Sequence, residues 1–348
     1  MMDTTTIAVD LAKHVFEVAE ANRAGRVTGR RRLTRTQFSR FLRQQPPAHV
    51  VMEACGTAHH WGRTAQACGH RVSLLPAQYV RPFVRRQKTD RTDATGLLDA
   101  VKADGIHPVA VKTVAQQELL ALHRMRQQWM TTRTARINAL RGFLREHGIA
   151  VATGPARVVA DVAQLVADAE APIPSRLRHL LANIVEDIRA IETHIDRVER
   201  DLRAIADADP VVDRLMTIPG VGMLTATALV ATVPHIHSFP RARRFASWLG
   251  LTPREHSSGT RRVLGGITKQ GDVYLRCLIT HGARSALLAA RRAATAQRPI
   301  TPVQQWALQV ADRRGHNRAA IAVANKLARI IWAVWTRDQA FTPQPTAA

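Results

Sequence analysis

The chain has 348 residues, 46% of them hydrophobic, so it can bury a core and is long enough for two domains of ordinary size. It carries 50 lysines and arginines against 27 aspartates and glutamates, a formal net charge of +23, which favours a polyanionic partner such as nucleic acid. No uninterrupted apolar run reaches the roughly 18 residues of a membrane span, and no apolar signal-peptide core stands near the N-terminus, so neither membrane insertion nor secretion is expected.

Cysteine and histidine usage predicts a reduced, cytoplasmic protein without structural zinc. Cys55, Cys68 and Cys277 form no C-x-x-C pair, and their odd number argues against a disulfide scaffold. His59 and His60 are adjacent, but no second group of ligands follows at zinc spacing.

Residues 5–104 predict a mixed α/β sheet with helices on its faces. The first apolar run turns polar at Lys13 and His14 and then alternates, which is typical of two strands joined by a tight connection. Thr34 begins an amphipathic segment and is a typical helix cap. Further strands are expected in 26–33, 48–56 and 70–77, and helices in 34–45, 59–69 and from Gln78 to about Asp104.

Beyond this region the sequence predicts helices. Residues 115–147 form a basic helical segment, and residues 150–176 read as a less regular linker. In the first of these, the positions expected to be buried are Leu119, Leu122, Met125, Trp129, Ile137, Leu140 and Leu144. A second compact, helical region is expected from about Asp209 to Asp338, followed by a disordered tail.

An apolar seam with alternating four- and three-residue steps runs through residues 177–202. This spacing is typical of a coiled coil, either antiparallel or dimeric, although a helix packed within its own domain gives the same pattern. The predicted organisation is therefore an α/β domain at 1–110, basic helices with a linker and coiled coil at 111–208, a mostly α-helical domain at 209–338 and a tail at 339–348.

Four carboxylates are placed where a metal site could form. Asp10 ends the first predicted strand, Glu53 ends a later one, and Asp90 and Asp93 lie three residues apart near a helix start. An acid within an apolar run is costly to bury without a positive partner, and all-oxygen ligation suits Mg²⁺, with Mn²⁺ as a substitute. One or two such ions could clamp the oxygens of a phosphoryl transfer. On their own, Asp90 and Asp93 are equally typical of a solvated helix start.

The stretches "AVDLAK", "EACG" and "KTDRTDA" carry a family resemblance. Their order is similar to that of the RuvC-like, ribonuclease-H-type nuclease fold, and together they resemble the DEDD transposases of insertion sequences, in the family numbered one hundred and ten. The resemblance implies Mg²⁺ bound by the four carboxylates, with Lys13, Lys88 and Arg91 as contacts to nucleic acid. The chain departs from the family pattern after the E-x-x-G turn, where Ala58, His59, His60 and Trp61 stand in place of an early aromatic residue.

The second half holds two further motifs. The stretch "LMTIPGVGMLTATALVATV" predicts two helices around a Pro-Gly-x-Gly turn, similar to a helix-hairpin-helix, in which Gly220 and Gly222 would let backbone N–H groups approach a phosphate. A tight turn between packed helices gives the same pattern. Residues 245–279 then predict a polar loop between apolar helices, with two serines among the basic residues Arg254, Arg261, Arg262 and Lys269. A serine in such a loop could attack a phosphodiester, and a phosphate-binding loop with structural serines is the alternative.

The serine loop resembles the C-terminal transposase domain of the same insertion sequences. That resemblance implies that Ser258, directly before Gly259, is the recombinase nucleophile, with Ser257 as the neighbouring alternative. It further implies a covalent phosphoserine intermediate, recognition of element ends and target DNA, a noncoding bridge RNA as partner and a nucleoid-associated location. The seam and the need to cut several strands predict a dimer or tetramer.

Three other functions remain open at this stage. One is a Mg²⁺-dependent nuclease that resolves Holliday junctions with activated water, and another is a non-catalytic nucleic-acid-binding protein. A tyrosine recombinase is less favoured, because Tyr79 and Tyr274 stand in no evident arginine and histidine constellation.

Overall fold

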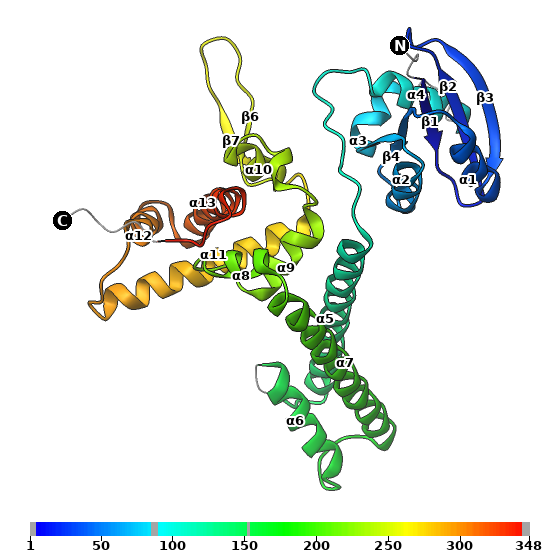
Figure 1. Cartoon of the computed structure of the whole chain (residues 1–348). Coiled ribbons are helices and arrows are strands. Elements are labelled where there is room, and N and C mark those ends of the chain that lie inside the picture. Colours follow the sequence, from blue (N-terminus) through cyan, green and yellow to red (C-terminus); the bar gives the residue numbers. More distant parts are fainter. Residues whose placement is uncertain (1–4, 85–89, 152–153, 343–348) are drawn as a thin grey trace. The chain divides into compact units, whose positions relative to one another are not determined.

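The computed structural model describes residues 5–84, 90–151 and 154–342 and divides into two compact units, Met1–Gln117 and Glu118–Ala348 (Figure 1). The side chains of Asp90 and Arg91 lie outside the described part, as does the whole of Lys88. Residues 118–208 and 209–338 share one unit. The first unit continues past residue 110 because Val109 bridges to Leu74 and the Arg63 guanidinium donates to Gln117 at 2.6 Å.

The first unit is built on a five-stranded mixed sheet with the order β3-β2-β1-β4-β5. β1, β4 and β5 run parallel, and β2 and β3 pair antiparallel beside them. The strands predicted from the sequence are confirmed as β1 (Thr6–Asp10), β2 (Val15–Ala21), β3 (Val27–Thr34), β4 (His49–Glu53) and β5 (Arg71–Leu75).

Helices cover both faces of this sheet. α1 (Arg35–Gln44) and α2 (Ala58–Ala67) pack on one face, where Phe16, Phe38 and Trp61 meet edge to face with ring centroids 5.1–5.3 Å apart. Trp61, at the departure from the family pattern, is therefore a core residue. α4 (Asp90–Ala100) packs on the other face against the small side chains of β1 and β2.

Two local predictions of helices are confirmed in the described residues. Thr34 caps α1 with a full capping box, in which its hydroxyl accepts from the Gln37 N–H and the Gln37 side chain accepts from the Thr34 N–H. The helical pattern expected from Gln78 to about Asp104 is confirmed in the described residues as α3 (Ala77–Val80), a 3₁₀ turn at Arg81–Phe83 and α4, whereas residues 85–89 lie outside the described part. Pro82 accounts for the end of α3, since proline has no backbone N–H with which to continue the hydrogen bonds of an α-helix.

The second unit begins with three packed helices: α5 (Val114–Glu146), α6 (Pro155–Ala167) and α7 (Ser175–Asp207). The expected irregular linker at 150–176 is wrong, since α6 buries Val158, Val159 and Val162 in a shared core with α5 and α7. Met125 was expected to be buried but is exposed.

The apolar seam of α7 is covered by helices of the same chain. Its first half packs with the end of α5, and Val198 and Leu202 pack with Leu119 near the start of α5, so the two helices run antiparallel. Ion pairs flank the contact, including Arg133 to Glu192 at 3.6 Å. The seam is thus an intramolecular helix pair, and it no longer argues for a dimer.

The remaining helices form the largest core. They are α8 (Pro210–Met216), α9 (Met223–Thr232), α10 (Ala242–Trp248), α11 (Val273–Thr295), α12 (Pro302–Arg314) and α13 (His316–Arg337), with a 3₁₀ turn at Ile236–Ser238. α13 has the length and apolar composition of a membrane span, but it buries the face from Ala319 to Val334 in this core. The expected tail partly docks, because the Phe341 N–H donates to the Thr217 hydroxyl at 2.8 Å; residues 343–348 lie outside the described part.

The Pro-Gly-x-Gly turn approaches α11 at backbone distance. Gly220 has a φ of 91°, and a Cβ built on Gly282 of α11 would lie 1.9 Å from the Gly220 carbonyl oxygen. The two glycines therefore allow a contact that any side chain would block, which accounts for Gly220 by packing.

We expect Gly282→Ala to lower the free energy of unfolding by about 3 kcal/mol, because the added methyl group must push the turn away from α11. Urea denaturation measures the change. The matched control is Gly142→Ala in α5, where a Cβ meets no atom within 4 Å and the higher helix propensity of alanine should add about 0.5–1 kcal/mol. Equal effects in the two variants would contradict this account.

Candidate active site

Asp10 and Glu53 stand at the carboxyl ends of neighbouring parallel strands. Val9 of β1 is paired with Met52 of β4, so Asp10 and Glu53 are the next residues of the same register. Side chains on one face alternate along a strand, and Ala8 and Val51, two residues earlier, belong to the core beneath α4. Both carboxylates therefore belong to the face that α4 covers, at strands about 4.8 Å apart.

The direction of α4 brings its first turn to the same end of the sheet. Leu98 and Val101 line one cavity together with Thr6 and His49, the first residues of β1 and β4. Because the end of α4 lies at the beginning of these strands, the helix runs against them. From Val101 back to Asp90 is about 16 Å of helix, and β1 spans about 13 Å, so the first turn of α4 is level with Asp10.

Asp93 contributes the observation that bears most directly on a metal. Its Oδ1 atom is buried and has no hydrogen-bond partner among the residues that the structure describes. A buried carboxylate oxygen without a partner is costly, whereas an oxygen donor for a hard cation is expected to lack one in the metal-free protein. The donor set Asp10, Glu53 and Asp93 therefore fits Mg²⁺ in chemistry. Among the described side chains no three His, Cys, Asp or Glu residues converge closely enough to hold an ion, and the side chain of Asp90 is outside that set.

Glu17 is a neighbour of this site that sequence reasoning did not find. It is paired directly with Asp10 across the antiparallel β1–β2 ladder, and its carboxylate lies 3.5 Å from the Arg32 guanidinium. The alternation of side chains in β2, which can be read from the sequence, places Glu17 on the same face as Ala19. Its pairing with Asp10 cannot be read in this way, because it depends on the register of the hairpin.

The predicted serine loop is a β-hairpin, which corrects the expectation that strands end with the first domain. β6 (Pro253–Glu255) and β7 (Leu264–Ile267) pair antiparallel, and the hairpin extends from the helices of its unit (Figure 1). Its tip is a tight turn in which the backbones of Ser258 and Arg261 exchange two hydrogen bonds of 3.2 and 3.1 Å. Gly259, with a φ of 55°, occupies the left-handed position of that turn.

The two serines have different environments. The Ser257 hydroxyl donates to Glu255 Oε1 at 2.8 Å and accepts from the Val263 N–H at 3.3 Å, so it ties the two strands together. The hydrogen bond from Ser257, and then the one from Arg262, hold the pKa of the Glu255 carboxyl below its ordinary value. The Ser258 side chain is exposed, and its hydroxyl has no partner among the residues that the structure describes.

The cations predicted around the loop are exposed on the hairpin or at its base. Arg254 donates to the Thr268 carbonyl at 3.2 Å, and Arg262 donates to Glu255 at 3.1 Å. Arg261 lies in the turn itself. Lys269 has a φ of 57°, a left-handed backbone that is uncommon outside glycine and asparagine, at the point where the strand returns to the helices.

The other predicted nucleic-acid contacts have less structural definition. Lys13 is exposed in the β1–β2 connection, and its carbonyl accepts from Arg35 at 3.4 Å. Gly222 caps the start of α9 with open space around it. Lys88 and the Arg91 side chain lie outside the described residues. The roles of these residues in binding nucleic acid stay predictions.

Known proteins match both halves of the chain. Residues 7–149 match a DEDD-type family model described as "Transposase", and residues 212–298 match one described as "Transposase IS116/IS110/IS902 family". The chain is 38% identical over 343 residues to a Pseudomonas aeruginosa protein named "Probable family 20 transposase", covering 98% of this chain and all of that one. The chain belongs to the IS116/IS110/IS902 family of transposases.

Two further relatives agree over nearly the whole length of this transposase. It is 38% identical over 341 residues to the transposase for insertion sequence element IS1111A of Coxiella burnetii, covering 98% of this chain and 92% of that protein. It is 34% identical over 342 residues to the transposase for insertion sequence element IS1328 of Yersinia enterocolitica, covering 98% and 100%. Family membership thus supports an insertion-sequence transposase that acts on DNA.

A buried polar network joins α5, α9 and α11 of the transposase. His123 of α5 is fully buried, with its ring nitrogens 3.1 Å from the Tyr274 hydroxyl of α11 and 3.0 Å from the Thr227 hydroxyl of α9. Arg126, one turn further along α5, pairs with Glu199 of α7. The sequence shows no arginine and histidine constellation around Tyr274, but in the structure its hydroxyl contacts His123, which in turn links α11 and α5 to α9.

Burial, and then the neighbouring Arg126, lower the pKa of His123 from 6.5 to about 4. In the unfolded chain His123 binds a proton as the pH falls below about 6.5, whereas in the folded protein it does so only near pH 4. The free energy of unfolding therefore decreases as the pH falls through this range. We expect a loss of about 3 kcal/mol across it. Thermal unfolding of wild type and His123→Gln between pH 7 and pH 4 measures this difference, and an equal pH dependence in both would contradict the assignment to His123.

Proposed function

We propose that the transposase cuts and rejoins DNA through a composite site, in which the carboxylates of the first unit act with Ser258 of the serine hairpin. The observation that carries the metal half is the buried, unpartnered Oδ1 of Asp93, at the end of the sheet where Asp10 and Glu53 stand. The order of motifs in the first 94 residues further supports a RuvC-like, ribonuclease-H-type arrangement.

Asp10, Glu53, Asp90 and Asp93 are the residues that would hold Mg²⁺, or Mn²⁺ in its place. When bound, such an ion neutralises the carboxylates and stabilises negative charge that develops on phosphate oxygens. The carboxylates themselves keep an anionic, oxygen-lined site at the strand ends, and the apolar core beneath α4 limits where water can enter.

Ser258 is the proposed nucleophile because its hydroxyl is exposed and uncommitted among the described residues, whereas Ser257 is bound at both its donor and its acceptor side. In the proposed step, Ser258 Oγ forms a bond to a backbone phosphorus and loses its proton to water. The bond from phosphorus to the leaving sugar oxygen breaks, and that oxygen takes up a proton. The phosphodiester survives as a serine ester, so reversal with a new sugar hydroxyl rejoins DNA without an energy-rich cofactor.

Arginines of the hairpin supply positive charge for the phosphate in this step. Arg261 lies within the turn that presents Ser258, and Arg254 and Lys269 lie at its base. Planar guanidinium groups match phosphate oxygens in geometry, and fixed cations stabilise charge as it develops.

The guide and the assembly are parts of the same proposal. The proposed bridge RNA comes from the family resemblance, and the net charge of +23 permits an RNA to be bound beside DNA. Moving an element requires several strand cuts, whereas one chain offers one Ser258, which supports a dimer or tetramer. Light scattering of the protein with bound nucleic acid measures the assembly, and a monomer in the active complex would contradict it.

A denaturing gel of the protein with labelled DNA of an element end and Mg²⁺ tests the function. We expect a protein–DNA adduct that survives denaturation and disappears on protease treatment. Cleaved ends without an adduct would instead support a nuclease that resolves junctions with activated water. Full mobility of the element with Asp10→Asn would support a non-catalytic nucleic-acid-binding protein.

A further inference from the structure

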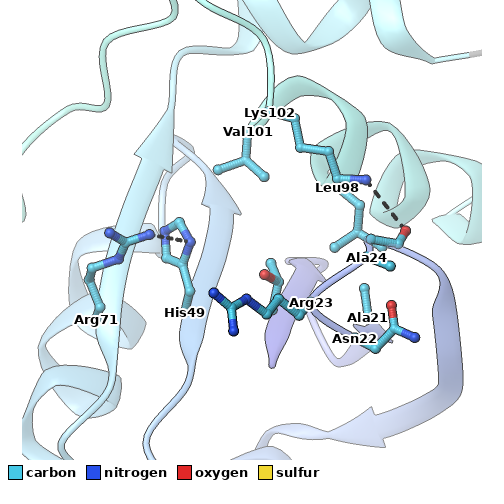
Figure 2. Close-up of a pocket in the computed structure, with 11 residues that line it drawn as sticks. Ala21, Asn22, Arg23, Ala24, His49, Arg71, Leu98, Val101 and Lys102 are labelled. Carbon is cyan, nitrogen blue, oxygen red and sulfur yellow. Dashed lines mark hydrogen bonds between the residues drawn. The ribbon is translucent and has the colours of Figure 1, made fainter. Parts of the chain in front are cut away.

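A basic cavity lies at the end of the sheet opposite the carboxylates. It has a volume of about 290 Å³ and is formed where the beginnings of β1, β4 and β5 meet the β2–β3 turn and the end of α4 (Figure 2). Arg23, Arg71 and Lys102 supply three cations around it, and none of its lining residues is an aspartate or glutamate. An acid-free concavity with three cations is suited to an anion.

Arg71 is oriented in this cavity by a neutral histidine. Its guanidinium donates to His49 Nδ1 at 2.8 Å, and His49 Nε2 lies 2.8 Å from the Ser73 hydroxyl (Figure 2). Burial, then the charge of Arg71, lower the pKa of His49 to about 4, so the ring accepts from Arg71 without adding charge of its own. An arginine has five N–H donors, so most of the fork remains available to a ligand.

Arg23 and Lys102 lie at the β2–β3 turn, and only Lys102 is hydrogen-bonded to it. The turn is closed by the Asn22 side chain, which accepts from the Arg26 N–H at 3.0 Å, and the Lys102 ammonium donates to the Gly25 carbonyl at 3.4 Å. Arg23 extends from this turn toward the cavity and makes no hydrogen bond or ion pair with any residue that the structure describes (Figure 2). Arg71 and Lys102 are therefore positioned before any ligand arrives, and Arg23 has no competing partner among the described residues.

We infer that this cavity binds a backbone phosphate of a nucleic acid strand outside the reacting segment. No phenylalanine, tyrosine or tryptophan lines it, so it offers cations for a phosphate and no platform on which a base could stack. The carboxylates lie at the other end of β1, about 13 Å away along this β-strand. A nucleic acid strand bound in the cavity is therefore contacted at a distance from the phosphate that reacts. DNA and RNA present the same phosphate chemistry. The inference needs only that the transposase binds nucleic acid, not that Ser258 or the carboxylates react.

Lysine footprinting tests the cavity directly, because the chain has only six lysines. The full chain, without Mg²⁺ so that nothing is cut, is acetylated with and without a short single-stranded DNA, the matching duplex and the matching RNA. Mass spectrometry then measures the extent of acetylation at each lysine. We expect Lys102 to be protected several-fold by at least one of the three, which also identifies the source of the phosphate. Lys326, packed over the Trp306 ring, is the internal reference.

Matched variants separate the cavity from general charge. Arg23→Ala should weaken binding of the protecting oligonucleotide several-fold and lower the slope of log K against log salt by about 1. Arg40→Ala, which removes an exposed arginine of α1 outside the cavity, should change both much less. Fluorescence anisotropy measures the affinities, and circular dichroism checks the fold.

The inference is overturned if the oligonucleotides bind but Lys102 reacts equally with and without them, or if Arg23→Ala and Arg40→Ala behave alike. Protection by inorganic phosphate alone, with no effect of any oligonucleotide, would also overturn it. Failure of the composite site shows differently: wild type would then form no adduct, or Ser258→Ala and Asp93→Asn would still form it, while the footprint at Lys102 stayed intact.

Discussion

Ser258→Ala should abolish the covalent protein–DNA adduct, while Ser257→Ala should still form it at roughly a tenth of the wild-type rate. Alanine at 258 removes the only oxygen that could bond to phosphorus at that position. Alanine at 257 removes the hydrogen bonds to Glu255 and Val263, each worth about 1 kcal/mol, and so loosens the hairpin without removing the nucleophile.

The two serine variants are matched controls for each other, because they remove the same atom at adjacent positions of one exposed hairpin. Quantifying adduct over time on a denaturing gel gives both rates. If the adduct survives in Ser258→Ala and is lost in Ser257→Ala, the roles are exchanged, and Glu255 becomes the base that accepts the Ser257 proton. If cleavage continues in both without an adduct, water is the nucleophile.

Asp93→Asn should lower the rate of DNA cleavage at least about 100-fold and remove the response of the protein to Mg²⁺. Loss of even the residues that support metal ligands costs 10–100-fold in metal affinity or activity, and loss of a direct ligand should cost no less. For wild type at 100 times the dissociation constant, bound Mg²⁺ should add about 2.7 kcal/mol to the free energy of unfolding.

The metal-free protein gives this prediction a second readout. Because Asp93 Oδ1 is buried without a partner, neutralising the side chain should not lower stability in EDTA and should raise it by about 1 kcal/mol. A purely structural Asp93 would give the opposite sign. Asp99→Asn is the control, since Asp99 is exposed on the same helix. Calorimetry of all three proteins with and without Mg²⁺ measures both effects, and a Mg²⁺ response retained by Asp93→Asn would contradict the assignment.

Much of the first unit could be predicted because its signals are local. The strands are recognisable from alternating or continuous apolar residues. The start of α1 is recognisable from Thr34 and Gln37, which are three residues apart and form a capping box. Asp10 and Glu53 could be placed at strand ends for the same reason, whereas the contact of Glu17 with Asp10 depends on hairpin register, which no local pattern fixes.

The second unit was harder because its signals are ambiguous or tertiary. The heptad spacing of α7 is the same whether the partner is another chain or α5, so the sequence left the partner open. α6 is short, begins after Gly154 and is followed by an irregular segment that ends at Pro174, so the stretch resembles a linker in sequence. β6 and β7 lack alternation since nearly all their side chains face solvent, and the pairing of His123 with Tyr274 joins residues far apart in the chain.

The course of α4 against the strands has a consequence for how this chain can change. The helix begins with the acidic turn at the carboxyl ends of β1 and β4 and leads to Lys102 at the opposite end of the sheet, so its length fixes the separation of the proposed metal site from the proposed phosphate site. One residue inserted between Asp93 and Leu97 would rotate the acidic turn by about 100° relative to the buried face. We therefore expect an insertion within α4 to abolish DNA cleavage even though every carboxylate is retained.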